Sequence, residues 1–290
     1  MSGYRTAGMV SAVALLLAAG PAQSKTIEET IGLPVEAIDG RDGATISQKI
    51  QVTIYRDDAW RAKQPFMILN HGRSASAGDR AATRTGPYAA NARYFVSRGF
   101  AVFLPVRIGY GASGGPDIED TGACDAKNYP PGYEAAAQQS LAVIAHAKAQ
   151  PYVDAQRGIV LGQSFGGTTA ITLAARGVPG VLAAVNFAGG GGGRPMSHPG
   201  QPCHHDRLTR MFAAYGATAR IPTLWVYSEN DRYWGQDKPR EWFSAFLKAG
   251  GQGRYVQLPP YKEDGHPSFT GQPQAWKPEF EAFVKEAMGR

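Results

Sequence analysis

Short runs of apolar residues, bounded by turn-forming residues, recur along the chain. Each run has the length and composition of a buried β-strand. The runs lie at residues 50–55, 65–70, 100–106, 158–161, 181–187, 223–227 and 255–258. Segments with helical spacing separate several of them, so the pattern predicts strands that alternate with helices. This alternation is typical of an α/β fold, a mostly parallel twisted sheet with helices on both faces.

The helical segments combine an apolar side with a recognisable end. Their expected ranges are residues 88–97, 134–148, 168–175, 239–248 and 274–288. The last of these ranges places Trp276, Phe280 and Phe283 on one side, which is the pattern of a helix packed on a sheet.

Two long segments, residues 107–132 and 189–204, lack either pattern, and the second contains five consecutive glycines. Long irregular segments in a compact domain are usually functional or disordered. Both follow the carboxyl end of a predicted strand, where open α/β sheets bind their ligands. We therefore expect these segments to form the walls of a pocket.

Length and charge narrow the class of protein. A chain of 290 residues fits a single large α/β domain. The formal net charge is +6, but the basic residues are scattered and never form a long run. This distribution indicates a solvated surface and no nucleic-acid partner.

The first residues have the pattern of a targeting segment. Arg5 precedes an apolar stretch at residues 9–19, and small residues suited to cleavage follow. The stretch is short for a membrane span, so we expect a secretory signal peptide over residues 1–24 and a single domain over 25–290. The mature protein would begin near Gln23 or Lys25 and be periplasmic or secreted, with no stable membrane insertion after the signal is removed.

Export changes the expectation for the two cysteines, Cys124 and Cys203. An oxidising compartment permits disulfides, so we expect these residues to pair. The alternative is two separate buried thiols. Each cysteine belongs to one of the two irregular segments, and a disulfide would therefore join two walls of the expected pocket.

The strongest chemical signal follows the apolar run at 158–161. Gly162, Ser164 and Gly166 form a Gly-x-Ser-x-Gly pattern between a predicted strand and a predicted helix. Glycines on both sides of a serine permit a sharp strand-to-helix turn that exposes the hydroxyl to a substrate. This is the pattern of a nucleophile elbow.

A serine hydroxyl needs a base to take its proton and an acid to orient that base. His266 lies just beyond the last predicted strand, and Asp231 lies beyond the strand before it. Glu229 is the alternative acid, because it is only two residues from Asp231. The order of serine, acid and histidine is typical of one hydrolase arrangement and differs from two common protease orders.

The other histidines have simpler interpretations. His146 falls within a predicted helix, whereas His198, His204 and His205 lie in or beside a polar loop with no evident set of metal ligands. We expect no metal and no cofactor. The Gly-x-Gly-x-x-Gly spacing at residues 109–114 lacks the helix that a dinucleotide site requires.

Acyl transfer also requires groups that stabilise an oxyanion. The backbone N–H of Phe165, directly after the serine, is the first expected donor. The loop after the strand at 65–70 begins His71-Gly72-Arg73, and we expect the backbone N–H of Arg73 to be the second. His71 is expected to pack beneath this loop.

Five motifs occur together in order, namely the His-Gly-Arg loop, RIGYGASGG, GQSFGG, SENDRYW and DGHPSF. Over residues 45–288 this set resembles the α/β-hydrolase superfamily, nearest to exported proteins described as dienelactone-hydrolase-like. The resemblance implies Ser164, Asp231 and His266 as the catalytic triad, with Phe165 and Arg73 at the oxyanion hole. Dienelactone hydrolases use a cysteine nucleophile, whereas this elbow holds Ser164, which favours general ester hydrolysis.

We therefore expect a metal-independent serine hydrolase of small or aryl carboxylic esters. Tyr110 and Trp234 are the expected substrate-binding aromatic residues. Two alternatives stay open: a serine peptidase or aminopeptidase with the same triad, and a non-catalytic protein that binds a small ligand. The sequence does not determine the oligomeric state.

Overall fold

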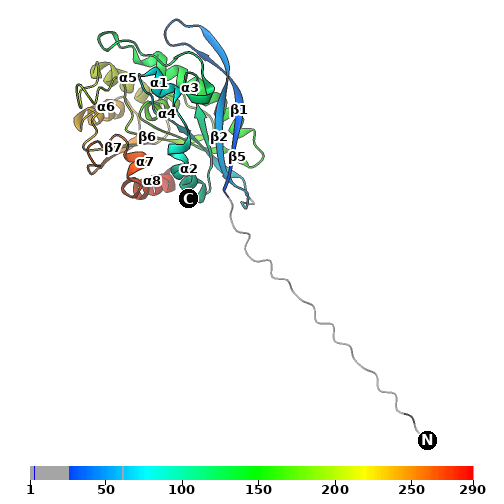
Figure 1. Ribbon diagram of the computed structural model, residues 1–290. Helices are drawn as coiled ribbons and strands as arrows, with labels where there is room; N and C mark the ends of the chain where they lie inside the picture. The colour runs from blue at the N-terminus through cyan, green and yellow to red at the C-terminus, as the bar shows by residue number, and fades with distance from the viewer. Residues whose placement is uncertain (1–2, 4–25, 61, 290) are drawn as a thin grey trace.

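A sheet forms the centre of the protein (Figure 1). It has eight strands in the order β1-β2-β4-β3-β5-β6-β7-β8. The computed structural model describes residues 3, 26–60 and 62–289. Apart from Gly3, the expected signal peptide at 1–24 lies outside the described residues. The strands are β1 (Thr26–Ile38), β2 (Thr45–Asp57), β3 (Gln64–Asn70), β4 (Ala101–Val106), β5 (Val153–Gln163), β6 (Val181–Phe187), β7 (Thr223–Ser228) and β8 (Gly253–Leu258).

The sheet is mostly parallel, as expected. Strands β3 to β8 pair in parallel, whereas β2 runs antiparallel to both β1 and β4. The parallel strands therefore end at one edge of the sheet, and each leads into a loop there. These loops contain Ser164, Asp231, His266 and Arg73, so the topology alone gathers the expected site residues from distant parts of the chain.

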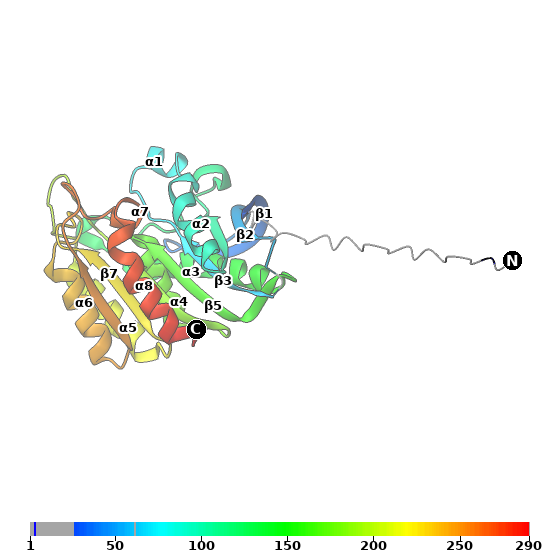
Figure 2. The same cartoon turned by 90° about the horizontal axis from the view of Figure 1, so that it is seen from below.

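Helices cover both faces of the sheet, and Figure 2 shows α8 and α2 on the side turned toward the viewer. The α-helices are α1 (Ala77–Ala81), α2 (Ala89–Ser97), α3 (Tyr129–Lys148), α4 (Phe165–Ala175), α5 (His205–Thr218), α6 (Asp237–Lys248), α7 (Ser268–Gly271) and α8 (Pro273–Met288). Short 3₁₀ turns occur at η1 (Gly86–Tyr88), η2 (Gly111–Ser113) and η3 (Cys124–Ala126). None of the described helices is long and apolar enough to cross a membrane.

The core has two parts because successive residues of a strand point to opposite faces. In β3, Phe66 and Ile68 join the cluster that packs against α3, α4, α5 and α6. Met67 and Leu69 join the cluster beneath α2, α7 and α8. Every residue of β3 is buried, which explains why most of its residues are apolar with no alternating polar positions.

Several elements differ from the sequence expectation, including helices α1, α5 and α7, which were not predicted. Strand β1 was not predicted, and it is an edge strand whose residues are mostly exposed or half-buried. It contains Gly32 and Pro34, which an edge strand tolerates because one side of its backbone needs no partner. Helix α3 begins at Tyr129, five residues before the expected start at 134, because prolines fit the first turn of a helix.

Candidate active site

Ser164 occupies a sharp turn between β5 and α4. Its backbone has φ 56° and ψ −124°, a left-handed conformation that costs a side-chain-bearing residue on the order of 1–3 kcal/mol. A Cβ on Gly162 would lie 2.2 Å from the carbonyl oxygen of Gly166, and one on Gly166 would lie 2.3 Å from that of Asn70. Both glycines are therefore required by close backbone contacts, as the elbow pattern predicts.

Asp231 and His266 are brought together from the loops after β7 and β8. His266 Nδ1–H donates to Asp231 Oδ2 at 2.9 Å. The other carboxylate oxygen accepts the backbone N–H groups of Tyr233 at 2.8 Å and Trp234 at 3.2 Å. The carboxylate is fully buried, and these N–H donors stabilise its negative charge. Because Nδ1 carries the proton that bonds to Asp231, Nε2 is free to accept a proton.

Glu229, the alternative acid, is exposed, and its backbone N–H pairs with Leu258 of the neighbouring strand. The carboxylate that contacts the imidazole therefore belongs to Asp231. Their positions in the chain explain why only Asp231 reaches the imidazole. Glu229 directly follows Ser228, the last residue of β7, and still pairs with β8, whereas Asp231 lies further into the loop.

The two loops are joined by residues whose role the sequence analysis did not identify. Oδ1 of Asp264 accepts the backbone N–H groups of both Arg232 at 3.0 Å and His266 at 2.9 Å. The ring of Tyr233 stacks on the imidazole with centroids 3.9 Å apart. Asp264 was visible in the DGHP motif, but its bond to a residue more than thirty positions earlier had no sequence signal.

Ser164 and His266 both line a cavity of about 480 Å³. Among the described residues, the imidazole of His266 is hydrogen-bonded to Asp231 and not to the Ser164 hydroxyl. Nucleophile and base in unliganded hydrolases are often slightly too far apart to bond and approach in the substrate complex. The structure thus places the three expected residues in one site, with the acid and the base already in contact.

The two expected oxyanion donors both belong to segments next to the serine. Phe165 is the first residue of α4, where backbone N–H groups lack helical acceptors and the helix dipole favours negative charge. In the loop after β3, a Cβ on Gly72 would lie 3.3 Å from Ser164 Cβ and 3.8 Å from its Oγ. Arg73 follows Gly72 directly and lines both cavities that contain Ser164.

His71 packs beneath the loop, as expected. It is buried, and its Nε2 accepts the backbone N–H of Arg107 at 3.2 Å. Burial, followed by the positive charge of Arg107, lowers the pKa of His71 well below its usual value. The ring is therefore neutral at physiological pH and serves as a hydrogen-bond acceptor for the backbone.

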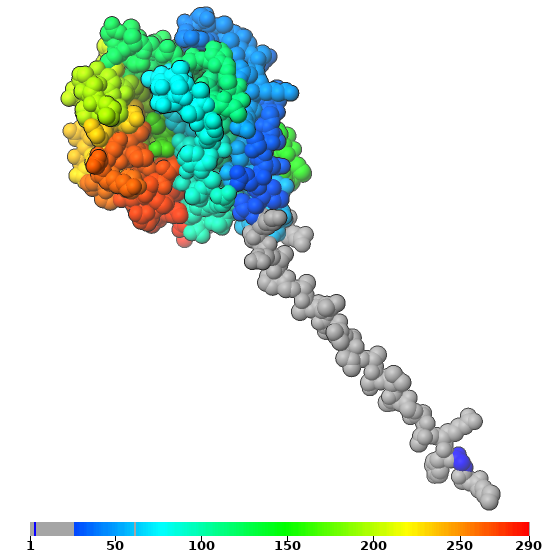
Figure 3. Space-filling model, in the orientation of Figure 1, coloured from blue at the N-terminus to red at the C-terminus, as the bar shows by residue number. Residues whose placement is uncertain are grey.

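A larger cavity of about 750 Å³ opens beside Ser164. Its walls include both irregular segments, and Cys124 and Cys203 lie in it as a disulfide with Cα atoms 5.2 Å apart. This confirms the expected pairing and its position between two walls. Figure 3 shows the neighbouring segment around α1, in cyan, at the surface of the molecule.

Four of the five consecutive glycines, residues 190–193, line this cavity. A Cβ on Gly190 would lie 2.9 Å from the rings of Trp234 and Trp242, and one on Gly191 would lie 2.6 Å from the Tyr133 hydroxyl. That hydroxyl donates to the carbonyl of Gly190 at 2.7 Å. Side chains at Gly190 and Gly191 are excluded because aromatic side chains occupy the space that they would need.

Of the two aromatic residues expected to bind substrate, only one lines a cavity. Trp234 lines the larger cavity, together with Tyr233 and Phe165. The expectation that Tyr110 binds substrate is wrong, because this residue is only 1% exposed and lines neither cavity. Its hydroxyl donates to Glu119 at 2.7 Å beneath the loop that contains Arg73. The sequence alone does not show whether a tyrosine after a strand lines a cavity or is buried beneath a loop.

Comparison with known proteins adds a family match. A model of the dienelactone hydrolase family matches residues 88–281. The sequence matches none of the curated proteins.

Solved structures share the fold at low sequence identity. A dienelactone hydrolase-like promiscuous phosphotriesterase from metagenomic libraries is 15% identical, with a TM-score of 0.55 over 90% of this chain and 98% of that one. The acylaminoacyl peptidase of Pyrococcus horikoshii is 14% identical, with a TM-score of 0.60 over 89% of this chain and 41% of that one. A puromycin-hydrolyzing peptidase of Mycobacterium tuberculosis is also 14% identical, with a TM-score of 0.56 over 89% of this chain and 40% of that one.

Proposed function

The chain belongs to the dienelactone hydrolase family, and from this premise we propose that it is a serine hydrolase that cleaves small or aryl carboxylic esters through an acyl-enzyme. The observation that carries the proposal is the 2.9 Å contact between Asp231 and His266, beside a cavity that the elbow serine also lines. An oriented imidazole and a strained serine that line one cavity, with a buried acid bonded to the imidazole, are the parts that nucleophilic acyl transfer requires.

In the first half of the reaction, Ser164 Oγ bonds to the ester carbonyl carbon while His266 Nε2 takes the hydroxyl proton. The electron pair of the carbonyl π bond moves onto oxygen, where the N–H groups of Phe165 and Arg73 stabilise the negative charge. Asp231 holds the imidazole in the required tautomer and stabilises the imidazolium. Collapse of the intermediate breaks the bond to the alcohol oxygen, which leaves with the proton from His266.

In the second half, water attacks the acyl carbon and gives a proton to the same Nε2 atom. A second tetrahedral intermediate collapses, the bond to Ser164 Oγ breaks, and the proton returns to the serine. The products are a carboxylic acid and an alcohol, and the enzyme regains its starting state.

Cavity size and lining support the substrate class. A volume of about 750 Å³ lies within the range of small-molecule sites. Trp234, Tyr233 and Phe165 provide an aromatic surface beside Ser164, which suits an aryl group in either the acyl or the alcohol part.

The test uses an ester and an active-site probe. The mature protein should hydrolyse p-nitrophenyl acetate, and a fluorophosphonate should label Ser164, whereas Ser164→Ala should lose both. Inertness of the wild type toward a panel of short and aryl esters would refute the ester hydrolase. Absence of fluorophosphonate labelling would favour the non-catalytic binding protein instead.

A peptidase is the second candidate, supported by the fold shared with two peptidases. The chain spans only about 41% and 40% of those proteins, so the likeness concerns only part of each. Comparing an aminoacyl p-nitroanilide with the matching p-nitrophenyl ester separates the two functions. An ester hydrolase should prefer the ester by far more than the intrinsic reactivities of the two compounds.

We also propose export to the periplasm or the exterior, supported by the Cys124–Cys203 disulfide. Mass spectrometry of the protein expressed with its full leader should find a mature form that begins near Gln23 or Lys25. An intact amino terminus in the purified protein would contradict this.

A further inference from the structure

The loop formed by residues 71–75, here the oxyanion loop, has little support from its own backbone. Among the described residues, none of these five exchanges a backbone-to-backbone hydrogen bond with another residue. An oxyanion donor nevertheless has to be held to within about 0.5 Å of its working position. Side chains from elsewhere must therefore determine where the Arg73 N–H points.

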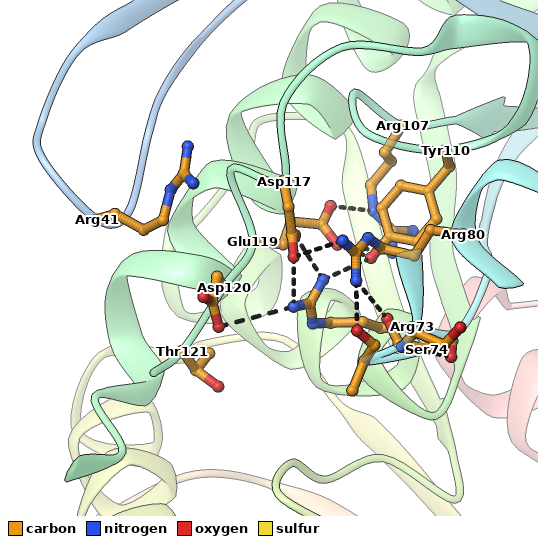
Figure 4. Close-up of polar contacts among 12 residues, drawn as sticks. Arg41, Arg73, Ser74, Arg80, Arg107, Tyr110, Asp117, Glu119, Asp120 and Thr121 are labelled. Carbon is orange, nitrogen blue, oxygen red and sulfur yellow. Dashed lines mark hydrogen bonds and ion pairs between the residues drawn. The ribbon is translucent and has the colours of Figure 1, made fainter. Parts of the chain in front are cut away.

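Asp117 makes the closest side-chain contacts with Arg73, the donor residue, whereas Asp120 Oδ1 lies 3.8 Å from Arg73 Nη2. Its carboxylate accepts two hydrogen bonds from the Arg73 guanidinium, at 2.6 and 2.9 Å (Figure 4). This fork geometry fixes a guanidinium in both distance and plane.

The same carboxylate holds the following residues of the loop through Arg80. Arg80 Nη2 lies 3.1 Å from Asp117 Oδ2. Arg80 Nη1 donates to the carbonyl oxygens of Ser74 at 3.1 Å and Ala75 at 2.8 Å. Asp117 therefore connects, directly or through one guanidinium, to three of the five loop residues.

A second ion pair supports the start of the loop from beneath. Arg107 and Glu119 are both fully buried and 2.5 Å apart. Arg107 donates to the carbonyl oxygens of His71 at 2.9 Å and Gly72 at 3.4 Å. Tyr110 links the two pairs, since its hydroxyl donates to Glu119 at 2.7 Å and accepts from Arg73 Nη1 at 3.3 Å.

We propose that Asp117 is a positioning residue for the oxyanion hole: by clamping the Arg73 and Arg80 guanidinium groups, it aims the Arg73 backbone N–H at the substrate oxygen. The inference rests on the proposed esterase function. Asp117 suits a test better than Glu119, because its side chain is 17% exposed whereas that of Glu119 is fully buried, so water can partly replace the contacts that Asp117 loses. Its removal should alter catalysis more than folding.

The experiment compares Asp117→Asn with wild type on p-nitrophenyl acetate. Misplacing one oxyanion donor should lower kcat by about 10- to 100-fold and leave KM within about twofold. Affinity for an aryl trifluoromethyl ketone, which forms a tetrahedral oxyanion with the serine, should fall by the same factor as kcat. Thermal unfolding should shift by only a few degrees, and a purely structural residue would not move the ketone affinity selectively.

Asp39→Asn is the matched control. Asp39 is buried and pairs with Arg41 through two hydrogen bonds at 3.0 and 2.5 Å, without contacting the oxyanion loop. This variant should leave kcat and the ketone affinity unchanged. Arg73→Lys is a second test variant, because it retains the charge and the backbone N–H but loses the fork, and it should show the same pattern with a smaller loss.

The outcomes separate the inference from the function. An active wild type with unchanged kcat in both Asp117→Asn and Arg73→Lys would overturn the positioning role alone. A rise in KM without a loss of kcat would also overturn it, because it would place Asp117 in ground-state binding. An inert wild type would refute the proposed function itself. Should Asp117→Asn fail to fold, Arg73→Lys decides the question by the same two measurements.

Discussion

The side-chain amide of Gln163 donates to the backbone carbonyl of His266 at 3.1 Å, so the residue before the elbow serine also holds the loop of the proposed base. Tyr88 donates its hydroxyl proton to the amide oxygen of Gln163 at 3.2 Å and orients the amide. Strand β5 therefore determines the positions of both nucleophile and base, although the two lie about a hundred residues apart.

Replacing Gln163 with alanine should loosen the histidine loop relative to Ser164. We expect kcat for ester hydrolysis to fall by about tenfold or more with little change in KM, because small displacements of catalytic groups are costly. Gln257→Ala is the control, since it removes a similar amide bond, to the carbonyl of Tyr227 at 3.2 Å, outside the site. Equal rates in the two variants would show that the Gln163 contact has no catalytic importance.

The two candidate acids can be separated by conservative substitution. Asp231→Asn should lower kcat by about 10⁴-fold, because the amide cannot hold the imidazole in the tautomer that accepts a proton from serine. Glu229→Gln, only two residues away and exposed, should retain wild-type activity. Steady-state kinetics with p-nitrophenyl acetate measures both, and the reverse result would transfer the acidic role to Glu229.

The disulfide joins residues 79 positions apart. In the chain-entropy model a loop of that length stabilises the folded state by about 4 to 5 kcal/mol. Cys124→Ser with Cys203→Ser should therefore lower the free energy of unfolding by about 2 to 5 kcal/mol, measured by urea denaturation of the mature protein. Wild-type protein under reducing conditions should approach the stability of the double variant, and unchanged stability in both would contradict the expectation.

Acid should destabilise the protein through His71. Its pKa in the folded protein is lowered by burial and by Arg107, so below about pH 6.5 the unfolded chain binds a proton that the folded chain does not. Stability due to this group is complete above pH 6.5 and is lost as pH falls, by up to about 1.4 kcal/mol per pH unit. Urea denaturation at pH 7, 6 and 5 should show this slope.

His71→Gln retains an acceptor for the Arg107 N–H but does not titrate. Its stability should therefore change less between pH 7 and pH 5 than that of wild type. The control is His198→Gln, an exposed loop position that should keep the wild-type slope. A slope identical in all three proteins would exclude His71 as the source.

Some features that were not predicted had a recognisable local sequence pattern, and others had none. Helix α5 was not predicted, although Leu208, Met211 and Phe212 lie at helical spacing and are all buried. The omitted edge strand β1 gave no comparable signal, because an edge strand buries too few side chains to show a clear alternation. The burial of Tyr110 was equally hidden, since its partner Glu119 lies in an irregular segment whose path depends on the rest of the fold.

The sequence by itself determined the alternation of strands and helices, the glycine-flanked serine and the disulfide. These features depend on short-range sterics, on side-chain periodicity or on the compartment, and each leaves a local pattern. The sequence also favoured Asp231 as the partner of His266 but left Glu229 open, and the tertiary structure decided between them. The tertiary structure alone decided that Asp264 and Gln163 hold the histidine loop and that Asp117 clamps Arg73. Such contacts join loops from different strand ends, and their partners are determined only when the parallel sheet brings those ends to one edge.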